Sequence, residues 1–177
     1  RSTLFPYTTL FRSGSSGDQV LNAILNGCTD ITLFDICPFA KEYYYLKKAA
    51  ITLMNREEYL DFFCYRNYPK TFKRNKKAFF ESNFDILLDY LNSTNPEVCY
   101  FWSELLKKYK GKYIRHNLFS GDEYNVNTLK ILNRYLENDQ MYNLLRNRIN
   151  DVNIDFKYDN IFNIDDNIHY DNIFLSN

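Results

Sequence analysis

Apolar residues along most of the chain recur every three or four positions, which is the spacing of a helix with one buried face. This pattern predicts helices over residues 18–26, 38–53, 55–63, 83–91, 96–109, 127–136 and 139–149. Gly27 follows the first helix as a stop signal, and Asn55-x-x-Glu58 is close to a capping box at the start of the third. Most of the chain is therefore expected to be helical.

The helix over 38–53 and the two long helices after it carry the apolar faces that a core needs. We expect Phe39, Tyr43, Leu46, Ala50 and Leu53 on the buried face of 38–53, with Lys41, Glu42, Lys47 and Lys48 elsewhere. The following stripes are Phe84, Leu87, Leu88 and Leu91, then Val98, Phe101, Trp102 and Leu105.

Strand character is confined to short apolar runs at 30–34, 152–156 and 172–175. We interpret these runs as parallel strands that are buried on both faces and covered by helices. Parallel strands need long crossovers, and the intervening helices supply them. The pattern therefore predicts an α/β fold.

A glycine-rich turn precedes the first helix, and an acidic residue ends the first of these strands. The turn is Gly14-Ser15-Ser16-Gly17-Asp18, and Asp35 follows 18 positions after Gly17. In nucleotide-binding βαβ units, glycines let the backbone approach the ligand, the helix N-terminus offers N–H groups, and an acid about 20 residues later takes the ribose. The spacing favours such a site.

Each part of this motif has a simpler interpretation. The Gly-Ser run is also typical of an expression-tag linker. Asp35 is suitable as the N-cap of the next helix, for which Pro38 stands at a first-turn position. Ligand binding is the interpretation that we carry forward.

Composition narrows the classes of partner. Acidic and basic residues number 22 each, and this balance argues against a nucleic-acid partner. No run of about 18 apolar residues is present, so no transmembrane segment is predicted, while a peripheral membrane contact is left open. Cys28, Cys37, Cys64 and Cys99 lack metal-ligand spacing, so we interpret them as reduced thiols of a cytoplasmic protein and predict no metal site.

The first 13 residues are unlike the rest. Pro6 interrupts them, and they resemble translated sequencing-adapter sequence rather than a signal peptide. We therefore expect residues 1–13 to be non-native, with residues 7–11 placed by chance where a first strand belongs, and residues 14–177 to form part of one domain. The remaining part of that domain is expected after Asn177 in a longer parent.

Three stretches resemble a known family. Residues 15–22 read Ser-Ser-Gly-Asp-Gln-Val-Leu-Asn, residues 31–38 read Ile-Thr-Leu-Phe-Asp-Ile-Cys-Pro, and residues 45–51 read Tyr-Leu-Lys-Lys-Ala-Ala-Ile. They are similar to the family containing BtaA, the S-adenosylmethionine:diacylglycerol 3-amino-3-carboxypropyl transferases and their uncharacterised bacterial relatives. The resemblance covers about 14–63 and resumes at 170–177.

The resemblance implies a fold and a cofactor. The fold is a partial Rossmann-like sheet of the class I methyltransferase type, with a large helical insertion at about 54–150 between the second and third strands. The cofactor is S-adenosylmethionine, and the acceptor is a lipid or another small molecule.

The resemblance also implies roles for single residues. The methionine part of the cofactor is expected against Gly14, Ser15, Ser16 and Gly17, with Asp18 near its amino group. Asp35 is expected on the ribose hydroxyls, Asp159 and Asn160 near the adenine, and Ser176 beside the sulfonium centre. Asp159 has an alternative interpretation as solvated loop charge, because Asp155, Asp165 and Asp166 crowd the same segment. No catalytic residue is assigned.

Two function classes follow from the sequence. The first is an S-adenosylmethionine-dependent transferase that moves a 3-amino-3-carboxypropyl or methyl group, of which this chain is an inactive, poorly soluble fragment. The second is a non-catalytic helical interaction module in which the Gly-Ser turn is incidental.

Overall fold

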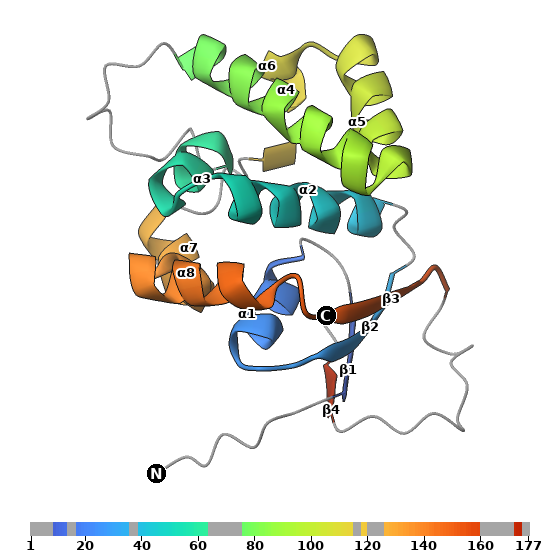
Figure 1. The fold of residues 1–177 in the computed structure, drawn as a ribbon, viewed down its shortest axis with the longest axis vertical. Helices are drawn as coiled ribbons and strands as arrows, with labels where there is room; N and C mark the ends of the chain where they lie inside the picture. The colour runs from blue at the N-terminus through green and yellow to red at the C-terminus, as the bar shows by residue number, and fades with distance from the viewer. Residues whose placement is uncertain are drawn as a thin grey trace.

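The computed structural model describes residues 9–13, 17–35, 39–63, 76–114, 118–119, 126–159 and 172–174. The chain is mixed α/β and mostly helical, with a small parallel sheet (Figure 1). The elements are β1 (Thr9–Ser13), α1 (Asp18–Leu25), β2 (Asp30–Phe34), α2 (Phe39–Leu53), α3 (Arg56–Phe63), α4 (Lys76–Thr94), α5 (Pro96–Lys108), α6 (Gly111–Ile114), α7 (Val126–Leu132), the 3-10 helix η2 (Arg134–Leu136), α8 (Asp139–Arg148), β3 (Asn153–Lys157) and β4 (Asn172–Phe174).

The strands form one sheet in the order β3-β2-β1-β4, and each neighbouring pair is parallel. The register places Ile31 of β2 between Leu10 of β1 and Ile154 of β3. The three strands predicted from the apolar runs are confirmed, and they are parallel as expected. A further strand, β1, lies in the segment that we expected to be non-native, close to the predicted 7–11, and it pairs with both β2 and β4.

The expectation that these strands are buried on both faces is wrong for β3. Asn153 and Asp155 are exposed, whereas Ile154 and Phe156 between them are partly buried. The Phe156 ring lies 5.8 Å from the ring of Tyr44 in α2, so the apolar face of β3 packs on helices. Alternation of this kind is the pattern of a strand with one covered face.

Helix α1 ends as the sequence predicts. Gly27 has a φ of 100°, a left-handed conformation that glycine adopts without strain. Its N–H donates to the Ile24 carbonyl at 2.9 Å, and the N–H of Cys28 donates to the Ala23 carbonyl at 3.1 Å. This pair of bonds is a Schellman motif, which satisfies the last carbonyls of the helix and turns the chain into β2.

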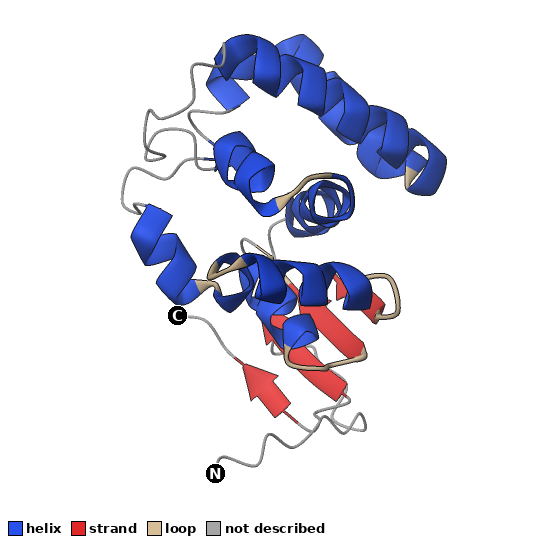
Figure 2. Cartoon of the chain, turned by 60° about the vertical axis from the view of Figure 1, so that its left-hand side comes forward, coloured by secondary structure: helices blue, strands red, loops and turns tan. Residues whose placement is uncertain are grey.

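The helices form layers above the sheet. In Figures 1 and 2, α2 and α3 lie between α4, α5 and α6 on one side and α1, α7 and α8 on the other. Helix α2 contacts α4 and α5 as well as α3 and α8. It is therefore the central helix of the molecule, with protein on two sides.

The predicted buried face of α2 is confirmed in part. Leu46 and Ala50 are fully buried, and Tyr43 packs against the core. Phe39 and Leu53, which we expected in the core, are 48% and 43% exposed, whereas Ala40, Tyr44 and Lys47 are buried. A single-stripe pattern assumes that one side of a helix faces water. Helix α2 has neighbours on both sides, so even a lysine from its expected polar side lies inside.

The remaining predictions hold with two changes of boundary. Asn55 and Glu58 form the expected reciprocal capping box, with distances of 3.0 Å from the Asn55 N–H to Glu58 Oε2 and 2.9 Å from the Glu58 N–H to Asn55 Oδ1. Helix α4 is longer than predicted. The predicted helix 127–136 is interrupted at Asn133, where the backbone is extended, and it continues as η2.

Candidate functional site

Three of the sequence-predicted residues lie at one edge of the sheet. Gly17 precedes α1, Asp35 directly follows β2, and Asp159 comes two residues after β3. Because the strands are parallel, their carboxyl ends share this edge, where open α/β sheets bind ligands. The topology therefore places Gly17, Asp35 and Asp159 along the same edge of the sheet. The other predicted residues Gly14, Ser15, Ser16, Asn160 and Ser176 lie outside the described residues.

Gly17 is the N-cap of α1 and has a φ of 74°. Its carbonyl accepts the first helical bond, from the Leu21 N–H at 3.1 Å. A Cβ at this position would lie 3.6 Å from the Cα of Tyr44, so α2 passes close by. That distance is an ordinary van der Waals contact, so the positive φ rather than lack of space favours glycine here.

Asp35 extends the contact between β2 and β3. Its N–H donates to the Lys157 carbonyl at 3.1 Å, which fixes its backbone at the end of the strand. Asp35 is half-buried, whereas Asp159 is exposed. The alternative role of Asp35 as an N-cap depends on residues 36–38, which lie outside the described residues.

The Asp18 carboxylate bonds to side chains of two other elements. Lys47 Nζ and the Tyr135 hydroxyl both lie 2.7 Å from Asp18 Oδ1. The carboxylate stands in the first turn of α1, where a negative charge is favourable. It connects the N-terminus of α1 to α2 and η2.

Lys47 is 4% exposed, which is rare for a lysine unless it is paired. Its Nζ lies 4.7 Å from the centre of the Tyr43 ring and 6.0 Å from the centre of the Phe63 ring. The carboxylate and the faces of two aromatic rings thus replace the water that the ammonium loses.

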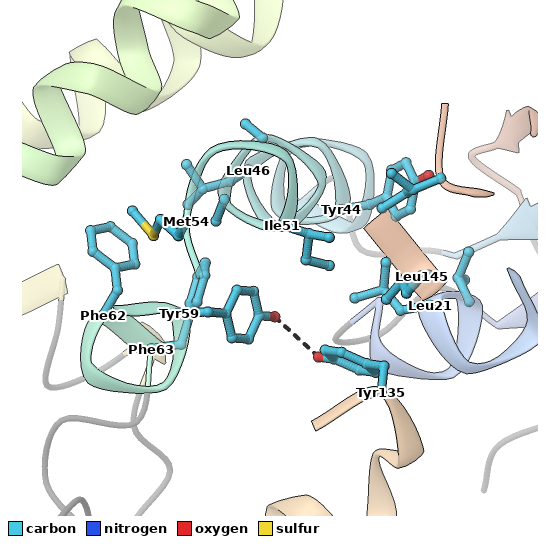
Figure 3. Close-up of a cluster of buried hydrophobic side chains, with 14 of the residues drawn as sticks. Leu21, Tyr44, Leu46, Ile51, Met54, Tyr59, Phe62, Phe63, Tyr135 and Leu145 are labelled. Atoms are coloured by element: carbon cyan, nitrogen blue, oxygen red, sulfur yellow. Dashed lines mark hydrogen bonds between the residues drawn. The ribbon is translucent and has the colours of Figure 1, made fainter. Parts of the chain in front are cut away.

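The hydroxyls of Tyr59 and Tyr135 continue the network at a separation of 3.1 Å, shown as a dashed line in Figure 3. Tyr135 has one hydroxyl proton, which it donates to Asp18, so Tyr59 donates to Tyr135. Burial, followed by the charge of Asp18, raises the pKa of both tyrosines well above the usual value. Both are therefore protonated donors at neutral pH.

The position of Tyr59 depends on the contact between α3 and η2. Arg56, one turn before Tyr59, lies 2.7 Å from Asp139 through its Nε and 3.3 Å from the Leu136 carbonyl through its Nη1. These bonds hold α3 against the segment that carries Tyr135. The Tyr59 and Tyr135 rings meet edge to face, with centroids 6.0 Å apart.

These polar groups line a cavity of about 440 Å³. Its walls come from α1, α2, α3, α7 and η2, together with residues 118–119. The lining residues are Asp18, Gln19, Asn22, Tyr43, Lys47, Tyr59, Phe63, Leu118, Phe119, Leu129, Leu132, Asn133, Tyr135 and Leu136. A mainly apolar cavity of this size with a few convergent polar groups is typical of small-molecule sites.

Asp18 was predicted from the sequence, whereas Lys47, Tyr59 and Tyr135 were not. Tyr59 and Tyr135 follow no local motif, because Tyr135 is 117 positions from Asp18. Lys47 did have a signal, since it is the lysine of the Leu-Lys-x-Ala-Ala-Ile stretch that carries the family resemblance. Its assignment to the polar side of α2 hid its role.

Of the cysteines, Cys28 is a buried free thiol and Cys99 a partly buried one, whereas Cys37 and Cys64 lie outside the described residues. Within the described part of the chain, no helix is both long enough and apolar enough to cross a membrane. Comparison with family models, curated proteins and solved structures finds no match to this chain.

Proposed function

We propose that this chain belongs to an S-adenosylmethionine-dependent transferase similar to the BtaA family. The observation that carries the proposal is the strand order β3-β2-β1-β4 with every neighbour parallel. The same order begins a Rossmann-like sheet, in which the ligand lies where the strand order reverses, above β1 and β4. Helix α2 is then the crossover helix that follows β2, and helices α3 to α8 form the insertion before β3.

The residues at the sheet edge suit the nucleoside and amino-acid parts of this cofactor. Gly17 leaves the backbone at the start of α1 without a side chain, and the first N–H groups of α1 follow it. Asp35 stands at the strand end from which a carboxylate takes the ribose hydroxyls in such folds. Asp159, Asn160 and Ser176 follow the neighbouring strands and complete the proposed set.

S-adenosylmethionine would supply an electrophilic carbon beside its sulfonium. This chain would bind and orient the reactants, because in-line placement supplies most of the rate in such transfers. The transferred group is 3-amino-3-carboxypropyl or methyl, and the acceptor is a lipid or small molecule. We place the reaction in the cytoplasm.

Substitution of Asp35 by asparagine tests the proposal. Binding of S-adenosylmethionine is measured by calorimetry on the longest native reading frame that contains this chain. Loss of a hydrogen bond to a charged group costs about 1.5–3 kcal/mol, so we expect Asp35→Asn to weaken binding by about 10- to 100-fold.

Asp30→Asn is the matched control. Asp30 is exposed at the opposite end of the same strand, away from the ligand edge. It should bind S-adenosylmethionine like the wild type. Absence of binding by the wild type, or equal affinity of the folded Asp35→Asn variant, would reject the proposal and favour a helical interaction module.

A further inference from the structure

A second pocket lies between α2 and the end of α4, and we call it the α2–α4 pocket. It has a volume of about 330 Å³, and its polar lining comes from Tyr45, Lys48, Tyr90, Thr94, Asn95 and Asn150. It shares no lining residue with the cavity around Asp18. The pocket is therefore a separate site, with room for a small molecule.

Lys48 carries the only charge among the described residues that line this pocket. It is partly buried, and no acidic side chain in the described part of the chain lies at ion-pair distance from its Nζ. The preceding residue, Lys47, is paired with Asp18 at 2.7 Å. Of these two neighbouring lysines of α2, only Lys47 has a counter-ion within the chain.

The surroundings of Lys48 compensate its charge incompletely. Burial lowers the pKa of Lys48, and the negative charge of Asp151 offsets that effect only in part. An ammonium that reached bulk water would keep its ordinary pKa. The protein therefore withholds part of the solvation that this charge needs, and an anion bound in the pocket would replace it.

Asn95 supplies a second polar group to the same pocket. It is the N-cap of α5, where an asparagine side chain commonly accepts a hydrogen bond from the first turn, but here it makes no such bond. Neither Lys48 Nζ nor the Asn95 amide belongs to the unpaired side-chain atoms that are sealed from solvent. Both groups are therefore accessible donors in the lining.

The charge balance of the described lining favours an anion with a single charge. Its polar groups are one ammonium and several neutral hydroxyls and amides, with no acidic side chain. A dianion would keep one charge uncompensated, and a cation would be repelled by Lys48. A carboxylate can accept hydrogen bonds from an ammonium and an amide at once. Ala49 and Leu91 complete the lining with apolar surface.

We infer that the α2–α4 pocket binds a small monocarboxylate, whose carboxylate accepts hydrogen bonds from Lys48 and Asn95 and whose apolar part lies against Leu91. The ligand supplies the counter-ion that Lys48 lacks. This inference does not depend on the proposed transfer reaction, because binding here is measured without S-adenosylmethionine.

Benzoate and benzamide test the inference as a pair of probes. They have nearly the same shape, but only benzoate is charged. Titrations of the 177-residue chain at neutral pH are followed by amide chemical shifts in nuclear magnetic resonance. Benzoate should bind on the order of tenfold more tightly, as expected for a hydrogen bond between charged groups. It should shift the signals of Lys48, Leu91 and Asn95.

Three variants separate the charge of Lys48 from the pocket and from the charge of the whole chain. Lys48→Met keeps the apolar stem and removes the ammonium, so the two probes should bind within about twofold of one another. Lys110→Met is the matched control, because Lys110 is exposed and lies outside the pocket. It should keep the preference for benzoate. Thr94→Trp places a large ring at the exposed side of the pocket and should abolish binding of both probes.

Three results would overturn the inference. They are equal affinity of the wild type for both probes, a preference for benzoate that persists in a folded Lys48→Met variant, and shifts confined to residues outside the pocket. A preference that is lost equally in Lys110→Met would show general attraction of anions to the chain and would also overturn it. If Lys48→Met fails to fold, the wild-type comparison and Thr94→Trp still decide.

Discussion

The sheet edge and the cavity are two polar regions that meet at the first turn of α1 and are built in different ways. The sheet edge consists of Gly17, Asp35 and Asp159, each positioned by the strand or helix next to it in sequence. The cavity instead depends on side chains from distant elements, with Asp18 joined to Lys47 and Tyr135. Local backbone geometry builds the first region, and long-range packing builds the second.

The difference has an energetic consequence. Removing a side chain from the sheet edge exposes little that is buried, whereas the cavity contains a buried ion pair and two buried hydroxyls. Changes in the cavity should therefore act on folding, and changes at the edge on ligand binding. The predictions below test that division.

The largest effect is expected at alkaline pH and arises from the helical region. Burial is the main cause that raises the pKa of four tyrosines above 10.0, namely Tyr44, Tyr59, Tyr135 and Tyr142. Because the folded pKa is the higher one, the stability that they contribute is complete below pH 10 and declines as pH rises above it. Each tyrosine lowers the free energy of unfolding by about 1.4 kcal/mol per pH unit above pH 10, so about 6 kcal/mol should be lost by pH 11.

Urea unfolding between pH 8 and 11 measures this loss, and tyrosinate absorbance shows when the buried hydroxyls ionise. Lys48 acts in the opposite direction, since burial lowers its pKa, but it is one group against four tyrosines. Stability that stays constant to pH 11 would show that the tyrosines are not buried as described.

Lys47→Met should be the most destabilising single change at the cavity. It removes the cation that neutralises the Asp18 carboxylate, whose side chain is only 19% exposed, and breaking a pair in such surroundings costs about 3 kcal/mol. Chemical denaturation gives the free energy of unfolding. Lys41→Met is the control, because its partner Glu97 is exposed and the pair is worth less than about 1 kcal/mol. Equal effects of the two variants would contradict the assignment.

Tyr135→Phe should cost about 2 kcal/mol, because it deprives the buried Tyr59 hydroxyl of its acceptor. Tyr59→Phe should cost less, since Tyr135 still donates to Asp18. The ranking follows from the direction of the hydrogen bonds, and the double variant should resemble Tyr135→Phe alone. A larger loss in Tyr59→Phe would mean that the chain of donors runs the other way.

The difference between local geometry and long-range packing also explains which features of the fold could be predicted from the sequence. The helix and strand periods, the Gly27 stop and the Asn55 capping box depend on neighbours a few positions apart, and the structure confirms them. The buried side of α2 was predicted only in part: Leu46 and Ala50 are buried, whereas Phe39 and Leu53 are exposed and Lys47 is buried. The burial of α2 on two sides depends on α4 and α5, which come later in the chain. No local pattern specifies which helices cover a given turn.

The residues of the candidate site also fall into those with a local sequence signature and those without one. Asp35 and Gly17 could be chosen because a strand end and a left-handed turn have local signatures. Asn133 could not, because its importance comes from an extended backbone that interrupts a predicted helix and from its contact with Asn22, 111 positions away. The cavity exists only where these distant segments pack together.

The smallest predicted effects concern the two glycines at the ends of α1, where an effect on stability can be distinguished from an effect on ligand binding. Gly17 and Gly27 both have positive φ, at 74° and 100°, so alanine at either should destabilise the chain by about 1 kcal/mol. Only Gly17 lies at the sheet edge. Alanine there can relax its strain by moving the first turn of α1, and Gly17→Ala should weaken S-adenosylmethionine binding by about tenfold. Gly27→Ala, which meets no atom within 4 Å, should leave binding unchanged. Unfolding and calorimetry on both variants test this, and equal losses of affinity would show that the edge is sensitive to the stability of α1 rather than to the backbone at Gly17.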